Sequence, residues 1–166
     1  DKNAARKPPR RTRERILEAS LRLFNEYGEP NVTTQLISDD LGISPGNLYY
    51  HFRSKDEIIE SLFADFERRI EDTLAAPERR LPDVEDVWLF LHLVFESEWD
   101  YRFLYRDLTE LISRNRLLET HFQRILRHQI HTAELICDGL VASGQMRASR
   151  GEIHSLAVTM TMTATY

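Results

Sequence analysis

The side chains best suited to specific contacts lie in residues 44–51, which read Ser-Pro-Gly-Asn-Leu-Tyr-Tyr-His. The hydroxyl, the amide, the two phenols and the imidazole of this segment can each donate or accept hydrogen bonds. The chain has no glycine-rich phosphate loop, no nucleophile elbow and no H-E-x-x-H motif, so the usual signatures of an enzyme are missing. The polar group in residues 44–51 therefore predicts binding rather than catalysis.

Two short helices are expected to position these groups. Residues 33–52 show a helix with a threonine cap at its start, a turn at Gly42, and a second helix capped by Ser44. Pro45 suits the first helical position because the N–H that proline lacks would have no partner there. The order of helix, tight turn and helix is that of a helix-turn-helix, whose second helix fits the major groove of DNA.

The two faces of the second helix differ in character. Apolar residues of the two helices and the turn between them would pack against an upstream helix. The residues of the pair are Ile37, Leu41, Ile43, Leu48 and Phe52, and those of the upstream helix are Leu17, Leu21 and Phe24. The residues left facing outward are Pro45, Gly46, Asn47, Tyr49, Tyr50 and His51. Small residues at 45 and 46 allow a close backbone approach, and Asn47 can reach a base edge or a phosphate. Tyr49 can contact thymine methyl groups or phosphates.

Helical periodicity runs through the rest of the chain and predicts an all-α fold. Apolar residues recur at three and four positions over residues 10–27, and a later helix is expected from residue 55 to about Leu74. Pro77 and Pro82 bracket a loop. Four further helical stretches are expected at Asp83–Trp99, Tyr101–Ser113, Arg116–Ser143 and Gly151–Tyr166.

Composition and charge narrow the class of protein. The chain has 166 residues, of which 42% are hydrophobic and 30% charged, an ordinary balance for a globular protein. No apolar run approaches the roughly 18 residues that cross a bilayer, and the single cysteine, Cys137, fits a reducing cytoplasm. Residues 1–55 carry a net charge of +3 and residues 56–166 one of −8. A basic head on an acidic body indicates a polyanion-binding face, although a disordered basic tail would give the same pattern.

Several segments between residues 10 and 60 share the pattern of one known family. They are Arg13-Glu14-Arg15-Ile16-Leu17-Glu18-Ala19, Leu23-Phe24, Tyr27-Gly28, Thr33-Thr34, Leu41-Gly42-Ile43-Ser44 and Leu48-Tyr49-Tyr50-His51-Phe52 with Lys55. This pattern closely resembles the tetracycline-repressor (TetR) family of bacterial transcription regulators. The run from Gly42 through Lys55 is its most specific part, while Leu36 and Ser38 depart mildly from the family pattern.

The resemblance implies a homodimeric repressor that binds a palindromic operator in double-stranded DNA and is released by a small-molecule effector. It implies a flexible basic arm at residues 1–9, a three-helix helix-turn-helix DNA-binding domain at 10–56, and a helical effector-binding and dimerisation domain at 57–166 that continues beyond the last residue. The expected DNA contacts are Thr33, Gln35, Ser44, Pro45, Gly46, Asn47, Tyr49, Tyr50, His51 and Lys55. No catalytic residue, metal or cofactor is expected. The alternative is a constitutive DNA-binding protein without a ligand.

Some of these residues have plainer explanations. Tyr49 and Tyr50 could be core aromatics, but Leu48 and Phe52 already supply a buried stripe, which favours exposure of Tyr49. Lys55 would begin a helix, where a positive charge opposes the helix dipole, so a phosphate partner explains it better than a solvated surface. The basic residues of the arm and its surroundings are expected to add nonspecific attraction rather than to enter a minor groove; they are Lys2, Arg6, Lys7, Arg10 and Arg11.

The C-terminal half is rich in aromatic residues, some of which could line an effector pocket. The candidates are Trp88, His92, Trp99, Tyr105 and Phe122, although most aromatics in a helical domain are ordinary core. His121, His128 and His131 share one helix face and suggest a metal site. No carboxylate or cysteine at a suitable spacing completes a ligand set, so the sequence favours no metal.

A dimer needs a contact surface remote from residues 33–55. The best candidates are the end of the long helix, at Ile130–Val141, and the apolar positions of the last helix, which are Ile153, Leu156, Ala157, Met160 and Ala164. The alternative is that the last helix only closes the core of its own subunit.

Overall fold

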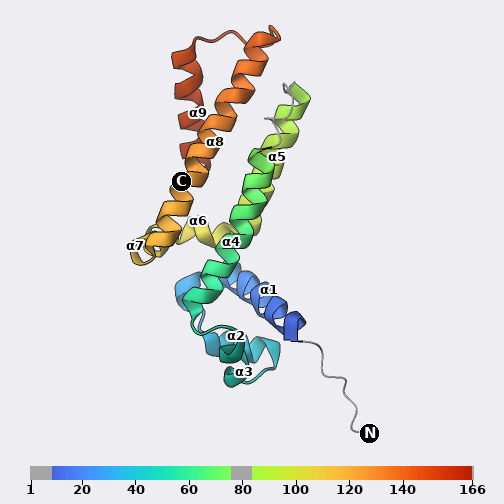
Figure 1. Cartoon of the computed structure of the whole chain (residues 1–166), viewed down its shortest axis with the longest axis vertical. Helices are drawn as coiled ribbons and strands as arrows, with labels where there is room; N and C mark the ends of the chain where they lie inside the picture. The colour runs from blue at the N-terminus through green and yellow to red at the C-terminus, as the bar shows by residue number, and fades with distance from the viewer. Residues whose placement is uncertain (1–8, 76–83, 166) are drawn as a thin grey trace. The chain divides into compact units, whose positions relative to one another are not determined.

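A computed structural model of the chain describes residues 9–75 and 84–165, which form helices joined by short turns (Figure 1). No β-strand occurs among the described residues, and the all-α prediction is confirmed. The chain divides into two compact units, residues 1–64 and residues 65–166. Within the described ranges, no helix is long and apolar enough to span a lipid bilayer.

The N-terminal unit is built from short helices around one apolar core. Its elements are α1 (Pro9–Tyr27), the 3-10 helix η1 (Glu29–Asn31), α2 (Thr34–Leu41), α3 (Pro45–His51) and the first half of α4 (Lys55–Leu74). Each element or its flank supplies fully buried apolar side chains, among them Ile16, Phe24, Val32, Ile37, Leu48, Phe52 and Ile58. Full burial of one such side chain contributes about 1.5–3 kcal/mol, so this stripe fixes α2 and α3 against α1 and α4.

Local signals set the ends of α2 and α3 as expected. Gly42 ends α2 with a φ of 63°, a left-handed conformation that glycine adopts without strain. Thr33 Oγ1 accepts a hydrogen bond of 3.1 Å from a backbone N–H of α2, and Ser44 Oγ accepts one of 3.2 Å from α3. Pro45 occupies the start of α3. The structure therefore confirms the predicted helix-turn-helix.

Within the described part of the C-terminal unit, the second half of α4 is followed by five further helices. These are α5 (Val84–Asp100), α6 (Arg102–Arg106), α7 (Leu108–Arg114), α8 (Arg116–Ala142) and α9 (Arg150–Thr165). After a turn at Gly144, α9 runs back along α8 (Figure 1). The buried face of α9 repeats every fourth residue, at Ile153, Ala157, Thr161 and Thr165.

Two element boundaries differ from those predicted. The expected stretch Tyr101–Ser113 is divided into α6 and α7 because Asp107 leaves helical geometry, with φ of −103° and ψ of 14°. Pro9 begins α1 instead of belonging to an arm, since a proline in the first turn of a helix loses no hydrogen bond.

The division into units also falls at a different place. The two units meet at residues 64 and 65, within α4, rather than after residue 56. The first half of α4 belongs to the N-terminal unit because Ile58, Ile59 and Leu62 are buried there, and Arg13 of α1 donates to Ser61 Oγ at 3.1 Å. The arm residues Lys2, Arg6 and Lys7 and the loop at residues 77–82 lie outside the described residues.

Candidate nucleic-acid interface

Helix α3 presents a polar face to solvent. Tyr50 is 81% exposed and Tyr49 is 48% exposed, whereas the adjacent Leu48 is fully buried. The rest of the face consists of exposed Pro45, Gly46 and Asn47 and half-buried His51. The predicted outward direction of this face is confirmed, with Tyr50 more exposed than Tyr49.

Thr33 and Ser44 have a structural task as the caps of α2 and α3. Each hydroxyl oxygen accepts a backbone N–H, at 3.1 Å and 3.2 Å. A hydroxyl that accepts in this way still has its own proton to donate. Because both residues are exposed, each can cap its helix and donate to a phosphate oxygen at the same time.

The remaining amides and phenols differ in how firmly the fold holds them. The Tyr49 hydroxyl lies 2.9 Å from Thr34 Oγ1, which ties α3 to α2. Gln35 Nε2 donates to Asp39 Oδ1 at 2.7 Å within α2. A binding partner would have to compete with Asp39 for the amide of Gln35. The side-chain amide of Asn47 makes no hydrogen bond to any described residue, which leaves its donor and its acceptor available.

Gly46 has no conformational reason to be glycine. Its φ is not positive, and an added Cβ would meet nothing nearer than Ser44 Oγ, at 3.9 Å. Glycine within a helix costs up to about 1 kcal/mol relative to alanine. The fold of the N-terminal unit therefore does not require glycine at this exposed position.

Lys55 has partners inside the fold, so its position at a helix start no longer calls for a phosphate partner. Lys55 Nζ lies 2.8 Å from Glu29 Oε1 and donates to the main-chain oxygens of Glu29 and Val32 at 3.0 Å each. Glu29 is fully buried and the Lys55 side chain is 25% exposed. A full negative charge at this distance outweighs the partial charge of the helix dipole. Lys55 therefore holds the start of α4 to η1.

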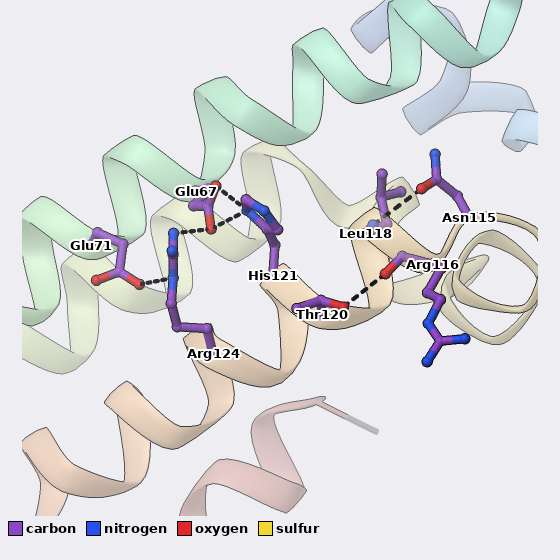
Figure 2. Close-up of polar contacts among 8 residues, drawn as sticks. All are labelled: Glu67, Glu71, Asn115, Arg116, Leu118, Thr120, His121 and Arg124. Atoms are coloured by element: carbon purple, nitrogen blue, oxygen red, sulfur yellow. Dashed lines mark hydrogen bonds and ion pairs between the residues drawn. The ribbon is translucent and has the colours of Figure 1, made fainter.

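In the C-terminal unit, polar side chains join the second half of α4 to α8 (Figure 2). His121 Nδ1 lies 2.9 Å from both carboxylate oxygens of Glu67, and Arg124 Nη2 donates to Oε1 of the same group at 2.6 Å. One turn further along, Glu71 lies 4.0 Å from Arg124 Nε and 2.5 Å from His128 Nδ1. These contacts hold α8 against the second half of α4.

The contacts also account for two of the three histidines that suggested a metal. His121 and His128 each face one carboxylate of α4, while His131 is exposed. Across residues 9–75 and 84–165, no three potential ligands converge on one point.

Two adjoining pockets, both open to solvent, lie in the C-terminal unit. The first, termed here the apolar chamber, has a volume of about 440 Å³ and walls that include Phe90, Val94, Phe95, Ala133 and Met160. The second, termed the aromatic chamber, has a volume of about 520 Å³ and walls that include His92, Phe95, Glu98, Trp99, Arg102 and Tyr105. Phe95 and Ala164 line both chambers, so the two are neighbours.

The structure brings together three of the five predicted pocket residues. His92, Trp99 and Tyr105 line the aromatic chamber. Trp88 lies outside both chambers and stacks on His92, with ring centroids 5.5 Å apart. Phe122 is buried as core against the Tyr105 ring, at 5.6 Å between centroids. The apolar chamber was missed because residues that line a cavity and residues that fill a core show the same periodicity.

Glu98 is the functional candidate that the sequence interpretation missed. Its side chain is buried, and Oε1 accepts hydrogen bonds from the Tyr105 hydroxyl at 3.3 Å and from Gln129 Nε2 at 3.1 Å. Burial raises the pKa of Glu98 to about 7, although both hydrogen bonds favour the charged form. A signal existed, because Glu98 continues the apolar stripe of Leu91 and Val94 along α5.

Family comparisons agree with the geometry of both units. Residues 16–62 match the model described as bacterial regulatory proteins of the tetR family, and residues 65–166 match the TetR model described as bacterial transcriptional repressor. The chain belongs to the TetR family. Its family members and structural neighbours are transcriptional regulators rather than enzymes.

Curated transcriptional regulators match parts of the chain. The transcriptional repressor KstR2 of Mycolicibacterium smegmatis is 31% identical over 80 residues, which are 44% of this chain and 39% of that protein. The transcriptional regulator UidR of Escherichia coli is 38% identical over 58 residues, which are 35% of this chain and 30% of that protein. The chain thus spans less than half the length of these relatives.

Solved structures of transcriptional regulators match almost the whole chain. A TetR-family transcriptional regulator from Marinobacter aquaeolei has a TM-score of 0.86 at 35% identity, covering 93% of this chain and 76% of that one. A transcriptional regulator from Saccharomonospora viridis in complex with choline has a TM-score of 0.75 at 21% identity, covering 94% and 82%. The second likeness concerns the fold alone.

Proposed function

We propose that this TetR-family chain is a dimeric repressor that binds a palindromic operator through α3 and leaves it when a small molecule binds the C-terminal unit. The observation that carries the proposal is the exposed polar face of α3 on a helix whose opposite side, at Leu48, is locked into the core. In a bacterial cell such a repressor acts in the cytoplasm, where the chromosome lies. The competing proposal is a constitutive DNA-binding protein, which would have no use for the two chambers.

The proposed DNA contacts combine base readout with phosphate binding. Asn47 is the best candidate for a base edge, because its amide has both hydrogen-bonding groups available. Phosphates and sugars suit the hydroxyls, the phenols and the imidazole around it. The proposed contact set is Thr33, Gln35, Ser44, Pro45, Gly46, Asn47, Tyr49, Tyr50 and His51.

A dimer follows from the need for two half-sites. One helix-turn-helix covers too little DNA to select a genomic site, and two-fold symmetry places a second copy about 34–36 Å away. On α9, one face is already used against α8 and Met160 lines the apolar chamber, but Leu156 and Met162 remain exposed. We place the dimer contact on this second face and on the end of α8.

The proposed mechanism is a shift between two arrangements of α4. Leu74 of α4 lines the apolar chamber, and Glu67 and Glu71 are held by α8. A ligand that fits one arrangement better than the other would move α4, whose first half belongs to the DNA-binding unit. The bound choline of the structural neighbour supports a small-molecule effector.

The direct test is to identify the DNA that the protein retains. Random duplexes are incubated with the protein, the retained fraction is sequenced, and the enriched sequence is used for binding titrations. Enrichment of an inverted repeat with half-sites about one helical turn apart supports the proposal. Retention without sequence preference contradicts it.

Replacing Asn47 with alanine should weaken binding to the enriched operator by about 1–3 kcal/mol without changing thermal stability, because the side chain makes no contact that holds the fold. Fluorescence anisotropy of labelled operator measures the loss. Gln123→Ala is the matched control, since it removes an exposed helical amide from α8. Equal affinities for both variants would place the readout on another surface.

Replacing Gly46 with alanine should act in opposite directions on stability and on DNA binding. The fold accepts a Cβ at this position, so the melting temperature stays the same or rises, while the added methyl group weakens operator binding about tenfold or more. Circular dichroism and anisotropy on the same sample measure both effects. Unchanged operator affinity would show that no partner approaches the backbone of residue 46.

A further inference from the structure

The unusual group in the C-terminal unit is the carboxyl of Glu98. Glu98 is 7% exposed and lines the aromatic chamber. Both of its hydrogen-bond donors, Tyr105 and Gln129, reach Oε1. Oε2 has no hydrogen-bond partner among the described residues. No Lys, Arg or His nitrogen of those residues lies within 4.0 Å of the Glu98 carboxylate, so the group forms no ion pair there. Glu98 is therefore an acid buried without a counter-charge.

The walls around this acid suit a positive charge. Phe95, Trp99, Tyr105 and His92 line the same chamber, and the faces of aromatic rings attract cations. The one cationic side chain in the lining, Arg102, is already engaged: its guanidinium lies 4.8 Å over the Trp99 ring and donates to the Trp99 carbonyl at 3.0 Å. An anionic ligand would have to approach a carboxyl that no basic side chain neutralises.

The neighbouring apolar chamber limits what else the ligand can be. It is about 440 Å³ in volume and its polar lining is confined to Gln129 and threonines of α9. Such a cavity accepts a hydrocarbon or aromatic body and offers little to a second charge. The two chambers meet at Phe95 and Ala164, so one molecule can reach both.

We infer that Glu98 anchors a lipophilic cation, an alkylammonium or arylammonium whose apolar body fills the adjoining chamber. This inference rests on the proposed function in one respect, since it names the class of the effector. The cation would supply the positive charge that no described side chain supplies to Glu98. The aromatic rings would replace part of the water around the cation. Gln129 would connect the site to α8, because it bonds to Glu98 and also lines the apolar chamber.

The test compares three probes of similar size with the full chain in calorimetric titrations. Benzyltrimethylammonium is the cation, neopentylbenzene is its neutral isostere, and 3-phenylpropanoate is an anion. At pH 8 the cation should bind about tenfold or more tightly than either of the others. Glu98→Gln should abolish this preference, whereas Glu110→Gln, which removes an exposed carboxylate of α7 that lines neither chamber, should change it less than about twofold.

The affinity for the cation should also depend on pH in a defined direction. Since the cation needs ionised Glu98, whose pKa is about 7, its affinity should fall roughly tenfold from pH 8 to pH 6. The groups that face Glu98 are His92 and Glu96 of α5, Arg102 and Tyr105 of α6, and Gln129 of α8. Any pH dependence left in Glu98→Gln comes from groups other than Glu98.

Each other outcome overturns the inference. Equal binding of cation and isostere, an unchanged preference in Glu98→Gln, or no binding of any probe would each show that Glu98 is not a cation anchor. Operator binding is measured separately. If neopentylbenzene binds and releases the protein from operator, the cation inference fails and the proposed function stands. If the protein retains no specific DNA, the proposed function fails and the calorimetric comparison still decides the ligand class.

Discussion

Replacing Lys55 with alanine should destabilise the N-terminal unit by roughly 3–5 kcal/mol, because the change removes the cation that lies against the buried carboxylate of Glu29. The Glu29 side chain has no exposed surface, and its Oε1 lies 2.8 Å from Lys55 Nζ. Two main-chain oxygens, those of Glu29 and Val32, lose the same donor. A destabilisation of roughly 3–5 kcal/mol is a large share of the free energy of unfolding of a small unit.

The measurement has to report on the N-terminal unit. Trp88 and Trp99 both lie in the C-terminal unit, so tryptophan fluorescence would miss the effect. Amide hydrogen exchange in α1 and α2 measures the opening free energy directly. Arg53→Ala, which removes an exposed cation two positions away, should change it by less than about 0.5 kcal/mol.

A double variant separates charge burial from lost packing. Glu29→Gln with Lys55→Met removes both charges and keeps most of the volume, so it should recover more than half of the stability lost in Lys55→Ala. If Lys55→Ala instead keeps normal protection and only weakens DNA binding, the phosphate role suggested by the sequence is correct and the structural role is wrong.

The C-terminal unit should lose stability as the pH rises, and Glu98 should be the cause. Its pKa is raised from 4.5 to about 7 by burial, so the folded protein binds a proton more tightly than the unfolded chain does. The stability gained from this proton is complete below pH 4.5 and is lost as the pH rises through about 7. The total difference is about 3 kcal/mol, since each unit of pKa corresponds to about 1.4 kcal/mol.

Urea unfolding followed by the fluorescence of Trp88 and Trp99 measures this effect between pH 5 and pH 8. Other groups also titrate in this range, but they do so equally in parent and variant. Glu98→Gln keeps the shape of the protonated acid, so the parent should fall by about 2–3 kcal/mol relative to the variant. Glu96→Gln, whose carboxylate is exposed, should follow the parent. Parallel curves for Glu98→Gln and the parent would show that Glu98 ionises like an exposed acid.

The helix-turn-helix could be predicted in detail because its signals are local. The caps of Thr33 and Ser44, the left-handed Gly42 and the proline that begins α3 each act within about four residues along the chain. Helical periodicity then separates the buried Leu48 from its exposed neighbours, and the motif pattern points to the family. These features need no knowledge of which distant segments meet.

The roles of Lys55 and Glu98 were decided by contacts between distant segments. Lys55 meets a carbonyl 26 residues away and Glu98 an amide 31 residues away. No periodicity specifies such partners, so Lys55 suggested a phosphate contact and Glu98 passed unnoticed among the acids of α5. The chambers are hidden from the sequence for the same reason, because a cavity is a space that several helices leave unfilled. Local interactions along the chain therefore establish the DNA-binding motif, whereas tertiary packing alone establishes where charge is buried and where a ligand has room.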